Sequence, residues 1–115
     1  YVIKNMEGGE IFVKKLPSIK ILDIAKAVNT SAKIKLIGIR PGEKLYEQMI
    51  SVEDSEHTYE FKDHYRILPS SKDKKYKSIS NKRRVSKTFS YSSNDNKVWM
   101  NYKQLKIWLK KNPDY

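Results

Sequence analysis

The chain has 115 residues, with 24 Lys and Arg against 13 Asp and Glu, and a net charge of +11 at pH 7. A single domain of this size can bury a core without disulfides or metal ions. It has no cysteine, which excludes a disulfide framework, a thiolate metal site and a cysteine nucleophile, and is compatible with a cytoplasmic location. No window approaches the ~18 apolar residues of a membrane span, so we expect a soluble protein without a membrane partner.

The first residues form a short apolar stretch followed by paired glycines. YVIKNMEGG, residues 1–9, indicates the last turns of a helix that stops at Gly8 and Gly9. Because this pattern is the end of an element, we expect that the start of the chain is missing. The β-branched and aromatic residues of GEIFVKKL then predict a strand over residues 10–14.

A helix and a second strand are predicted next. Pro17 and Ser18 indicate a helix start with Ser18 as the N-cap, and apolar residues recur at helical spacing as far as Val28. AKIKLIGI, residues 32–39, is apolar and rich in β-branched residues, which favours a strand that ends at Arg40. The resulting order of elements predicts an α/β fold.

The middle of the chain predicts a short helix followed by strands. Leu45 and Met49 lie four residues apart, which is enough for a helix with one apolar edge. EDSEHTYEFKDHYRILP, residues 53–69, is rich in aromatic and apolar side chains and predicts one or two short strands that Pro69 ends.

The last third combines a basic stretch with a helix. Residues 70–87 contain eight Lys or Arg against one Asp, which is typical of a solvated loop. WMNYKQLKIWLKK, residues 99–111, predicts a helix in which Asn101 and Gln104 form a capping box. The predicted buried stripe of this helix comprises Tyr102, Leu105, Trp108 and Leu109.

The titratable residues do not predict a catalytic or metal centre. His57 and His64 lie seven residues apart in a segment expected to be extended, which is not a metal-ligand spacing. The acidic side chains of this segment match no EF-hand, so we expect a solvated face. They are Glu53, Asp54, Glu56, Glu60 and Asp63. GxGxxG, P-loop and GxSxG motifs are absent from the sequence.

One loop within IGIRPGEKLYEQM, residues 37–49, is a candidate binding site. Pro41 and Gly42 would suffice to turn the chain, so Arg40 and Glu43 invite a functional explanation. An arginine can fork onto a phosphate, and a carboxylate across a tight turn can accept two hydrogen bonds from a ribose diol. The end of a predicted strand is also where open α/β sheets bind ligands. A surface salt bridge across the turn explains the same residues equally well.

The chain closely resembles the C-terminal part of bacterial UDP-N-acetylglucosamine 4,6-dehydratases. The resemblance runs in order through GGEIFVKKLPSIKILDIAKAV, KLIGIRPGEKLYEQMI, HTYEFKDHYRILP and FSYSSNDNKVWMNYKQLKIWL. These enzymes are extended short-chain dehydrogenases/reductases of capsule and O-antigen synthesis, and related proteins carry the name UDP-glucose 4-epimerase. The basic stretch is the least similar, and the family usually has VPK where this chain has VKK, residues 13–15.

The resemblance implies a fold class and a substrate site. The implied fold is α/β, the C-terminal substrate-binding part of an extended short-chain dehydrogenase/reductase without the Rossmann nucleotide-binding domain. Arg40 would meet the diphosphate of a UDP-sugar and Glu43 its uridine ribose. Pro41 and Gly42 would shape the turn, and Lys44 would add positive charge near the phosphates.

The resemblance also divides the chain and places the chemistry elsewhere. It implies a UDP-binding substrate domain over residues 1–69, a basic polar loop over residues 70–90 and a C-terminal helical segment of the same domain over residues 91–115. In the family, NADP oxidises C4 of the sugar, water is eliminated across C5 and C6, and the hydride returns to C6.

The residues that perform this reaction are expected upstream of the chain, on a Rossmann domain. We therefore expect no catalytic residue, no bound cofactor and no metal ion in these 115 residues, and no turnover by the chain alone. NADP would belong to the full-length parent. The implied partners are a UDP-sugar, the Rossmann domain and, at full length, further copies of the protein.

Two alternatives stay open beside the dehydratase. An epimerase of the same fold would return the hydride to C4 and eliminate nothing. A stand-alone basic module would bind nucleic acid through residues 72–87, and charge reversal at Lys82, Arg83 and Arg84 would abolish that binding. We favour the solvated loop over the nucleic-acid contact, because the composition alone accounts for the charge.

Overall fold

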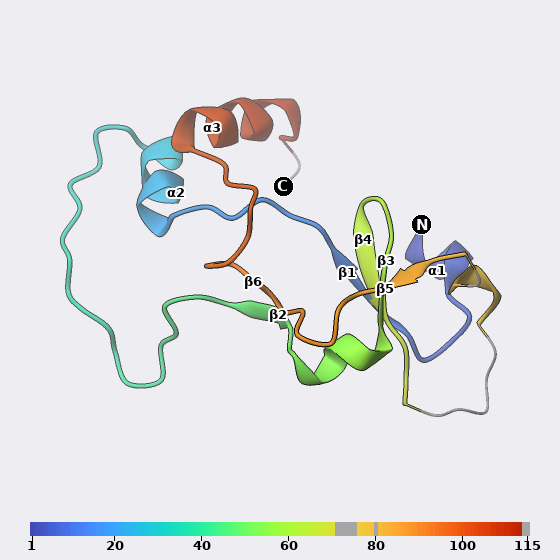
Figure 1. Ribbon diagram of the computed structural model, residues 1–115. Coiled ribbons are helices and arrows are strands. Elements are labelled where there is room, and N and C mark those ends of the chain that lie inside the picture. The colour runs from blue at the N-terminus through green and yellow to red at the C-terminus, as the bar shows by residue number, and fades with distance from the viewer. Residues whose placement is uncertain (71–75, 80, 114–115) are drawn as a thin grey trace. The chain divides into compact units, whose positions relative to one another are not determined.

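The protein forms two compact units, each built from two separate segments of the chain (Figure 1). The computed structural model describes residues 1–70, 76–79 and 81–113. Unit 1 comprises Tyr1–Lys15 and Gln48–Ser92, and unit 2 comprises Leu16–Glu47 and Ser93–Tyr115. The UDP-binding domain over residues 1–69, the basic loop over residues 70–90 and the helical segment over residues 91–115 stay predictions. None of the helices among the described residues is long and apolar enough to cross a membrane.

Unit 1 is built on a four-stranded antiparallel sheet with the order β1-β4-β3-β5. Its strands are β1 Ile11–Lys14, β3 Thr58–Glu60, β4 His64–Ile67 and β5 Arg83–Arg84. The strand predicted over residues 10–14 is thus confirmed, and the one or two strands predicted before Pro69 are present as two, β3 and β4. β4 lies between β1 and β3 and is buried at all four positions, so both faces of the sheet are covered there.

A second sheet of unit 1 pairs β2, Gln48–Ile50, with β6, Tyr91–Ser92. The predicted helix of Leu45 and Met49 is therefore wrong, since Met49 lies in β2. Pairing with β6 decides the outcome: Gln48 lies opposite Ser92 and Ile50 opposite Tyr91, with an irregularity between them. Ile50 is 0% exposed, whereas its neighbour Met49 is 52% exposed. Ile50 belongs to the core of unit 1, whose buried members are Val13, Ile50, Tyr65 and Ile67.

Short helical segments complete unit 1. α1, Val2–Asn5, confirms the helical stretch predicted before the glycines. The predicted stop at Gly8 and Gly9 is wrong, because the C-cap is Met6, whose backbone is already extended. The 3-10 helix η1, Glu53–His57, precedes β3, and a second 3-10 helix, η2, spans Lys77–Ile79.

The predicted basic loop is only partly irregular. Residues 71–75 and 80 lie outside the described residues. In the described remainder, Val85 packs against the core, while β5 pairs with β3 and keeps both of its arginines exposed. Charged side chains on an edge strand disfavour pairing with another chain, which explains their place there.

Unit 2 contains two helices that lie against each other, α2, Ile21–Val28, and α3, Tyr102–Lys111. The predicted N-cap is wrong, because α2 begins after Lys20 and not after Ser18. Ser18 is extended instead: its backbone N–H donates to the carbonyl of Val98 and its carbonyl accepts from the N–H of Met100, both at 2.9 Å. This pairing holds Ser18 outside the helix.

The capping box of α3 is confirmed. The side chain of Asn101 accepts from the Gln104 N–H at 3.0 Å, and the Gln104 side chain accepts from the Asn101 N–H at 2.9 Å. The predicted stripe holds in part: Leu105 is buried, Tyr102 and Leu109 are half-buried, and Trp108 is 40% exposed.

The strand predicted over residues 32–39 is wrong. Residues 32–40 have no regular structure, and no described strand pairs with them. A strand needs a neighbour for its backbone hydrogen bonds, so the local sequence preference is not sufficient here. Arg40 therefore does not follow a strand, and the argument from the edge of a sheet does not apply to it.

The contrast in burial between Ile50 and Met49 gives a direct test of β2. We expect Ile50→Ala to lower the free energy of unfolding by about 2–5 kcal/mol, because it leaves a cavity in a fully buried site. Met49→Ala, one residue away on the exposed side, is the matched control and should change it by less than about 0.5 kcal/mol. Denaturant unfolding followed by circular dichroism measures both. Equal losses in the two variants would contradict the assignment of β2.

Candidate functional site

The candidate site is the turn formed by residues 40–44, called here the Arg40 turn. The Glu43 N–H donates to the Arg40 carbonyl at 3.1 Å, Pro41 occupies the second position and Gly42 has φ +85° in the third. A proline followed by a residue of positive φ is the pattern of a type II turn. Pro41 and Gly42 therefore fix the separation of the two candidate side chains that flank them.

The turn brings the predicted pair together. The backbone N–H of Arg40 donates to Oε2 of Glu43 at 2.9 Å, and Nε of Arg40 lies 3.9 Å from Oε1 of Glu43. The side chains are 71% and 50% exposed, respectively. An exposed ion pair at this distance contributes little stability. The surface salt bridge considered from the sequence is thus present, and it leaves the guanidinium accessible to a ligand.

The Arg40 turn lies on the open surface of unit 2. Lys44 is exposed and directly follows Glu43. A cavity of about 530 Å³ lies elsewhere in unit 2, between the starts of α2 and α3. It is lined by Lys20, Asp23, Trp99, Met100, Asn101 and Gln104. The Arg40 turn is therefore an open surface site and contributes no wall to this cavity.

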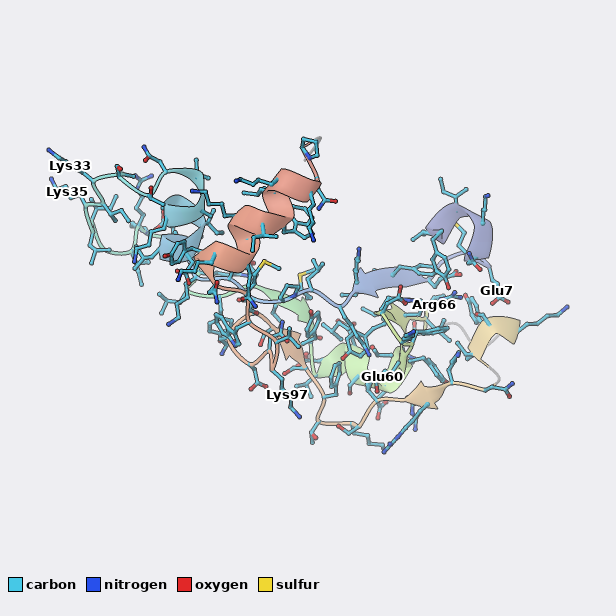
Figure 2. All side chains as sticks on the ribbon, turned by 90° about the horizontal axis from the view of Figure 1, so that it is seen from above. Glu7, Lys33, Lys35, Glu60, Arg66 and Lys97 are labelled. Atoms are coloured by element: carbon cyan, nitrogen blue, oxygen red, sulfur yellow. The ribbon has the colours of Figure 1, made fainter. Side chains whose placement is uncertain are left out.

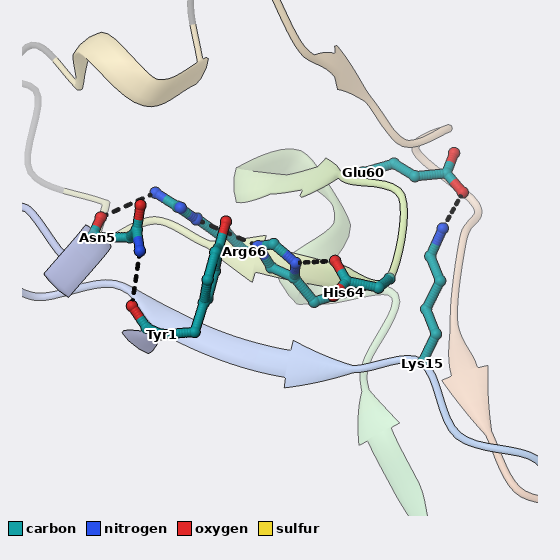
Figure 3. Close-up of polar contacts among 7 residues, drawn as sticks. Tyr1, Asn5, Lys15, Glu60, His64 and Arg66 are labelled. Carbon is teal, nitrogen blue, oxygen red and sulfur yellow. Dashed lines mark hydrogen bonds and ion pairs between the residues drawn. The ribbon is translucent and has the colours of Figure 1, made fainter. Parts of the chain in front are cut away.

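Unit 1 contains a buried arginine that the sequence analysis did not single out (Figure 3). Arg66 is 2% exposed, and its guanidinium lies 4.3 Å from the ring centre of Phe12 and 4.6 Å from that of Phe61. It donates to Oγ of Ser78 at 2.8 Å and to the carbonyl of Asn5 at 3.4 Å. These contacts connect β4 to α1 and η2, so Arg66 organises the sheet of unit 1.

His64 completes this cluster. Its Nε2 accepts from Nε of Arg66 at 3.4 Å, and its Nδ1 lies 2.7 Å from a carboxylate oxygen of Asp63. Since Nε2 is an acceptor, the hydrogen-bond network assigns the ring proton to Nδ1. Phe61 stacks on the ring at 4.5 Å. His64 is thus a buried structural residue, and the hydrogen bond from its ring lowers the pKa of Asp63.

Two glutamates before β1 have perturbed ionisation. The hydroxyl of Ser78 and the backbone N–H groups of Lys77 and Ser78 hold the pKa of Glu7 below its usual 4.5. Burial raises the pKa of Glu10, but hydrogen bonds from the backbone of Glu7, Glu10 and Gly8 outweigh this and keep it below 4.5. Glu7, Arg66 and Glu60, labelled in Figure 2, all belong to unit 1. Both carboxylates are structural acceptors.

Two glutamates of the acidic stretch form ion pairs with lysines from distant parts of the sequence. Glu60 pairs with Lys15 at 2.7 Å, and Glu56 pairs with Lys87 at 3.5 Å. Among the described residues, no group of three or more His, Cys, Asp or Glu side chains is arranged to hold a metal ion.

One Tyr-x-x-x-Lys spacing occurs in the chain, at Tyr102 and Lys106 of α3. The resemblance described above implies a catalytic tyrosine and lysine pair on the nucleotide-binding part of such an enzyme. Here Tyr102 is the first residue of a capped helix and Lys106 is exposed. No described contact joins either to the Arg40 turn, so the spacing alone gives no catalytic assignment.

The lowered pKa of Glu7 predicts a pH dependence of stability. A carboxyl whose pKa is lower in the folded state stabilises that state above its unfolded pKa, and this stabilisation is lost as the pH falls through the folded pKa. The midpoint of thermal unfolding is measured for the protein and for Glu7→Gln at several pH values from 3 to 7. At pH 7 the protein should have the higher midpoint, and the difference between the two midpoints should shrink below pH 4.5. A constant difference across this range would contradict the assigned role.

The chain is similar to two kinds of named protein. It is 45% identical to UDP-N-acetylglucosamine 4,6-dehydratase (inverting) from Campylobacter jejuni subsp. jejuni serotype O:2, over 91% of this chain and 34% of that protein. It is 38% identical to UDP-glucose 4-epimerase from Rickettsia canadensis, over 66% of this chain and 24% of that protein. The chain thus spans about a third or less of the length of these relatives.

A solved structure and a family match agree with these similarities. The X-ray structure of Pen from Bacillus thuringiensis superposes with a TM-score of 0.74 at 26% identity, over 97% of this chain and 34% of that one. The polysaccharide biosynthesis protein family matches residues 1–69, which is more than half of the chain. The chain therefore belongs to the polysaccharide biosynthesis protein family.

Proposed function

We propose that the chain is the C-terminal, UDP-binding part of a UDP-N-acetylglucosamine 4,6-dehydratase in polysaccharide biosynthesis. The observation that carries the proposal is the 45% identity to the Campylobacter jejuni dehydratase over 91% of the chain. The likeness to Pen supports the finer fold assignment, the substrate-binding part of an extended short-chain dehydrogenase/reductase. As part of such an enzyme, the chain would act in the cytoplasm on a nucleotide sugar and within a homo-oligomer.

The Arg40 turn is the proposed contact with UDP. A diphosphate offers two negative groups to the planar guanidinium of Arg40, and charge-assisted hydrogen bonds of this kind are stronger than an exposed ion pair. The carboxylate of Glu43 would then accept hydrogen bonds from the ribose hydroxyls, and Lys44 would add positive charge. Binding of UDP would replace the ion pair between Arg40 and Glu43 with contacts to the ligand. Both side chains already lie on the same turn, so binding would require little rearrangement of the backbone.

The NADP of such an enzyme would be bound outside these residues. A dinucleotide fingerprint joins a strand to a helix through glycines. Here Gly8 and Gly9 follow α1 and precede β1, and the glycines at 38 and 42 lie in irregular backbone. The four glycines of this chain do not form such a fingerprint, and no redox step is assigned to its residues. We expect no turnover by the chain alone.

An epimerase is the second candidate, because the Rickettsia canadensis relative carries that name. The two reactions differ in their products: a 4,6-dehydratase releases water and leaves a keto-sugar, whereas an epimerase leaves the composition of the sugar unchanged. Mass spectrometry of the product formed by an enzyme that includes this chain separates them. A nucleic-acid role for the basic stretch stays a prediction.

The site assignment is tested by titrating the isotope-labelled chain with UDP and following backbone amide signals by NMR. We expect shifts at residues 38–49, and we expect Arg40→Ala to weaken binding by about 2 kcal/mol, or roughly 30-fold in Kd. Arg83→Ala, an exposed arginine of β5, is the matched control and should bind UDP as the unchanged chain does.

Two results would contradict the assignment. Shifts that avoid residues 38–49 would place UDP elsewhere. Equal weakening by Arg40→Ala and Arg83→Ala would show that only the overall positive charge of the chain attracts the nucleotide.

A further inference from the structure

The cavity of unit 2 lies between the starts of its two helices. Its volume is about 530 Å³, which is within the usual range of ~300–1,000 Å³ for sites that bind small molecules. The walls come from the first turns of α2 and α3 and from the segment that leads into α3. The lining residues are Lys20, Asp23, Trp99, Met100, Asn101 and Gln104. Since none of them belongs to the Arg40 turn, the cavity is a separate candidate for binding.

Backbone pairing holds one wall of the cavity in place. The buried residue Ser18 forms a parallel bridge with Trp99. The N–H of Ser18 donates to the Val98 carbonyl and its carbonyl accepts from the Met100 N–H, both at 2.9 Å. The side chain of Trp99 is nevertheless 46% exposed. An indole that is open to solvent on a fixed backbone offers a ligand a large apolar surface at a small cost in conformational entropy.

The capping box of α3 supplies two amide donors. It uses the side-chain oxygens of Asn101 and Gln104, each of which accepts from a backbone N–H. Both side chains therefore keep an NH2 group, and neither NH2 group donates to another described residue. Because the box already restrains the two side chains, they lose little conformational entropy when they donate to a ligand.

The start of α2 adds one charge of each sign. Neither Lys20 nor Asp23 forms a side-chain ion pair or hydrogen bond with another described residue. An anionic ligand would be attracted by Lys20 and repelled by Asp23, and a cationic ligand would meet the reverse. A neutral ligand with hydroxyl groups satisfies both, because a hydroxyl accepts from an ammonium and donates to a carboxylate. The two charges therefore favour a neutral, polyhydroxylated ligand.

We propose that this cavity binds a neutral saccharide. The faces of a pyranose ring carry C–H groups, which pack on the indole of Trp99, and its edge carries hydroxyl groups. The hydroxyls accept from Lys20 and from the two amide NH2 groups, and they donate to Asp23. The proposal does not depend on UDP binding, since the Arg40 turn contributes no wall to the cavity. Unit 2 then has one site for a nucleotide and another for an uncharged sugar.

The proposal is tested by NMR titration of the isotope-labelled chain with glucose and with glucuronate. The two sugars have the same ring, but C6 of glucuronate is a carboxylate. We expect glucose to shift the indole N–H signal of Trp99 and to leave that of Trp108 unchanged, because Trp108 does not line the cavity. Glucuronate should bind about tenfold more weakly, since its carboxylate is costly to desolvate and is repelled by Asp23.

Two variants test the assigned contacts. Trp99→Ala removes the ring without removing the backbone pairing with Ser18, and should weaken glucose binding about tenfold. Asp23→Asn keeps the size of the side chain and removes its charge, so it should weaken glucose binding and strengthen glucuronate binding. A loss of folding would weaken both sugars and could not reverse their order. Lys26→Gln, on the same helix but outside the cavity, is the control and should change neither.

The other outcomes overturn the proposal. Glucose that shifts neither indole signal, or both equally, would show that the cavity is not a saccharide site. Leucine, a zwitterion that matches the two charges without a sugar ring, should bind more weakly than glucose, and the reverse order would assign the cavity to a different class of ligand. Equal effects of Asp23→Asn and Lys26→Gln would rule out the contact with Asp23. The UDP titration reports on residues 38–49 separately, so either site can fail without the other.

Discussion

A buried guanidinium determines how unit 1 is built. A charge that is removed from water must be compensated by hydrogen bonds and favourable electrostatics. Arg66 achieves this without a carboxylate within ion-pair distance among the described residues: two aromatic rings cover its faces, and oxygen and nitrogen acceptors lie at its edge. The acceptors come from α1, β4 and the segment of η2, so these elements must be in place together. Arg66 therefore links the sheet to both flanking segments.

The contrast with Arg40 explains where binding is expected. Arg66 is buried and donates to His64, Asn5 and Ser78, so it is not accessible to a ligand. Arg40 is mostly exposed and is restrained only by a weak ion pair across its own turn. Its backbone geometry is set by Pro41 and Gly42, which places the side chain without consuming its hydrogen-bonding capacity. A site of this kind suits a component of a larger binding surface, consistent with relatives about three times as long as the chain.

Elements with a strong local signal were predictable from the sequence. The capping box of Asn101 and Gln104 follows from two residue types at a fixed spacing, and it forms as expected. The strand at residues 10–14 was marked by β-branched and aromatic residues after paired glycines. The turn around Arg40 and Glu43 was equally local, and its two side chains do meet. The geometry of the turn leaves both side chains accessible to UDP.

The errors arose where distant partners decide the structure. Ser18 has the composition of an N-cap, but its backbone pairs with the segment around Trp99, eighty-one residues later in the sequence. Residues 32–39 have the composition of a strand, but no described strand lies beside them. The burial of Arg66 depends on Phe12, Phe61 and Ser78 together, which no short window contains. Local patterns predict what a segment prefers, and tertiary contacts decide which preference is realised.

The most direct test of the central claim is a crystal structure of the chain with UDP. Our account predicts diphosphate oxygens within hydrogen-bonding distance of the Arg40 guanidinium and ribose hydroxyls at the carboxylate of Glu43. UDP bound in the cavity beside Trp99, or on the arginines of β5, with Arg40 still paired only to Glu43, would contradict it.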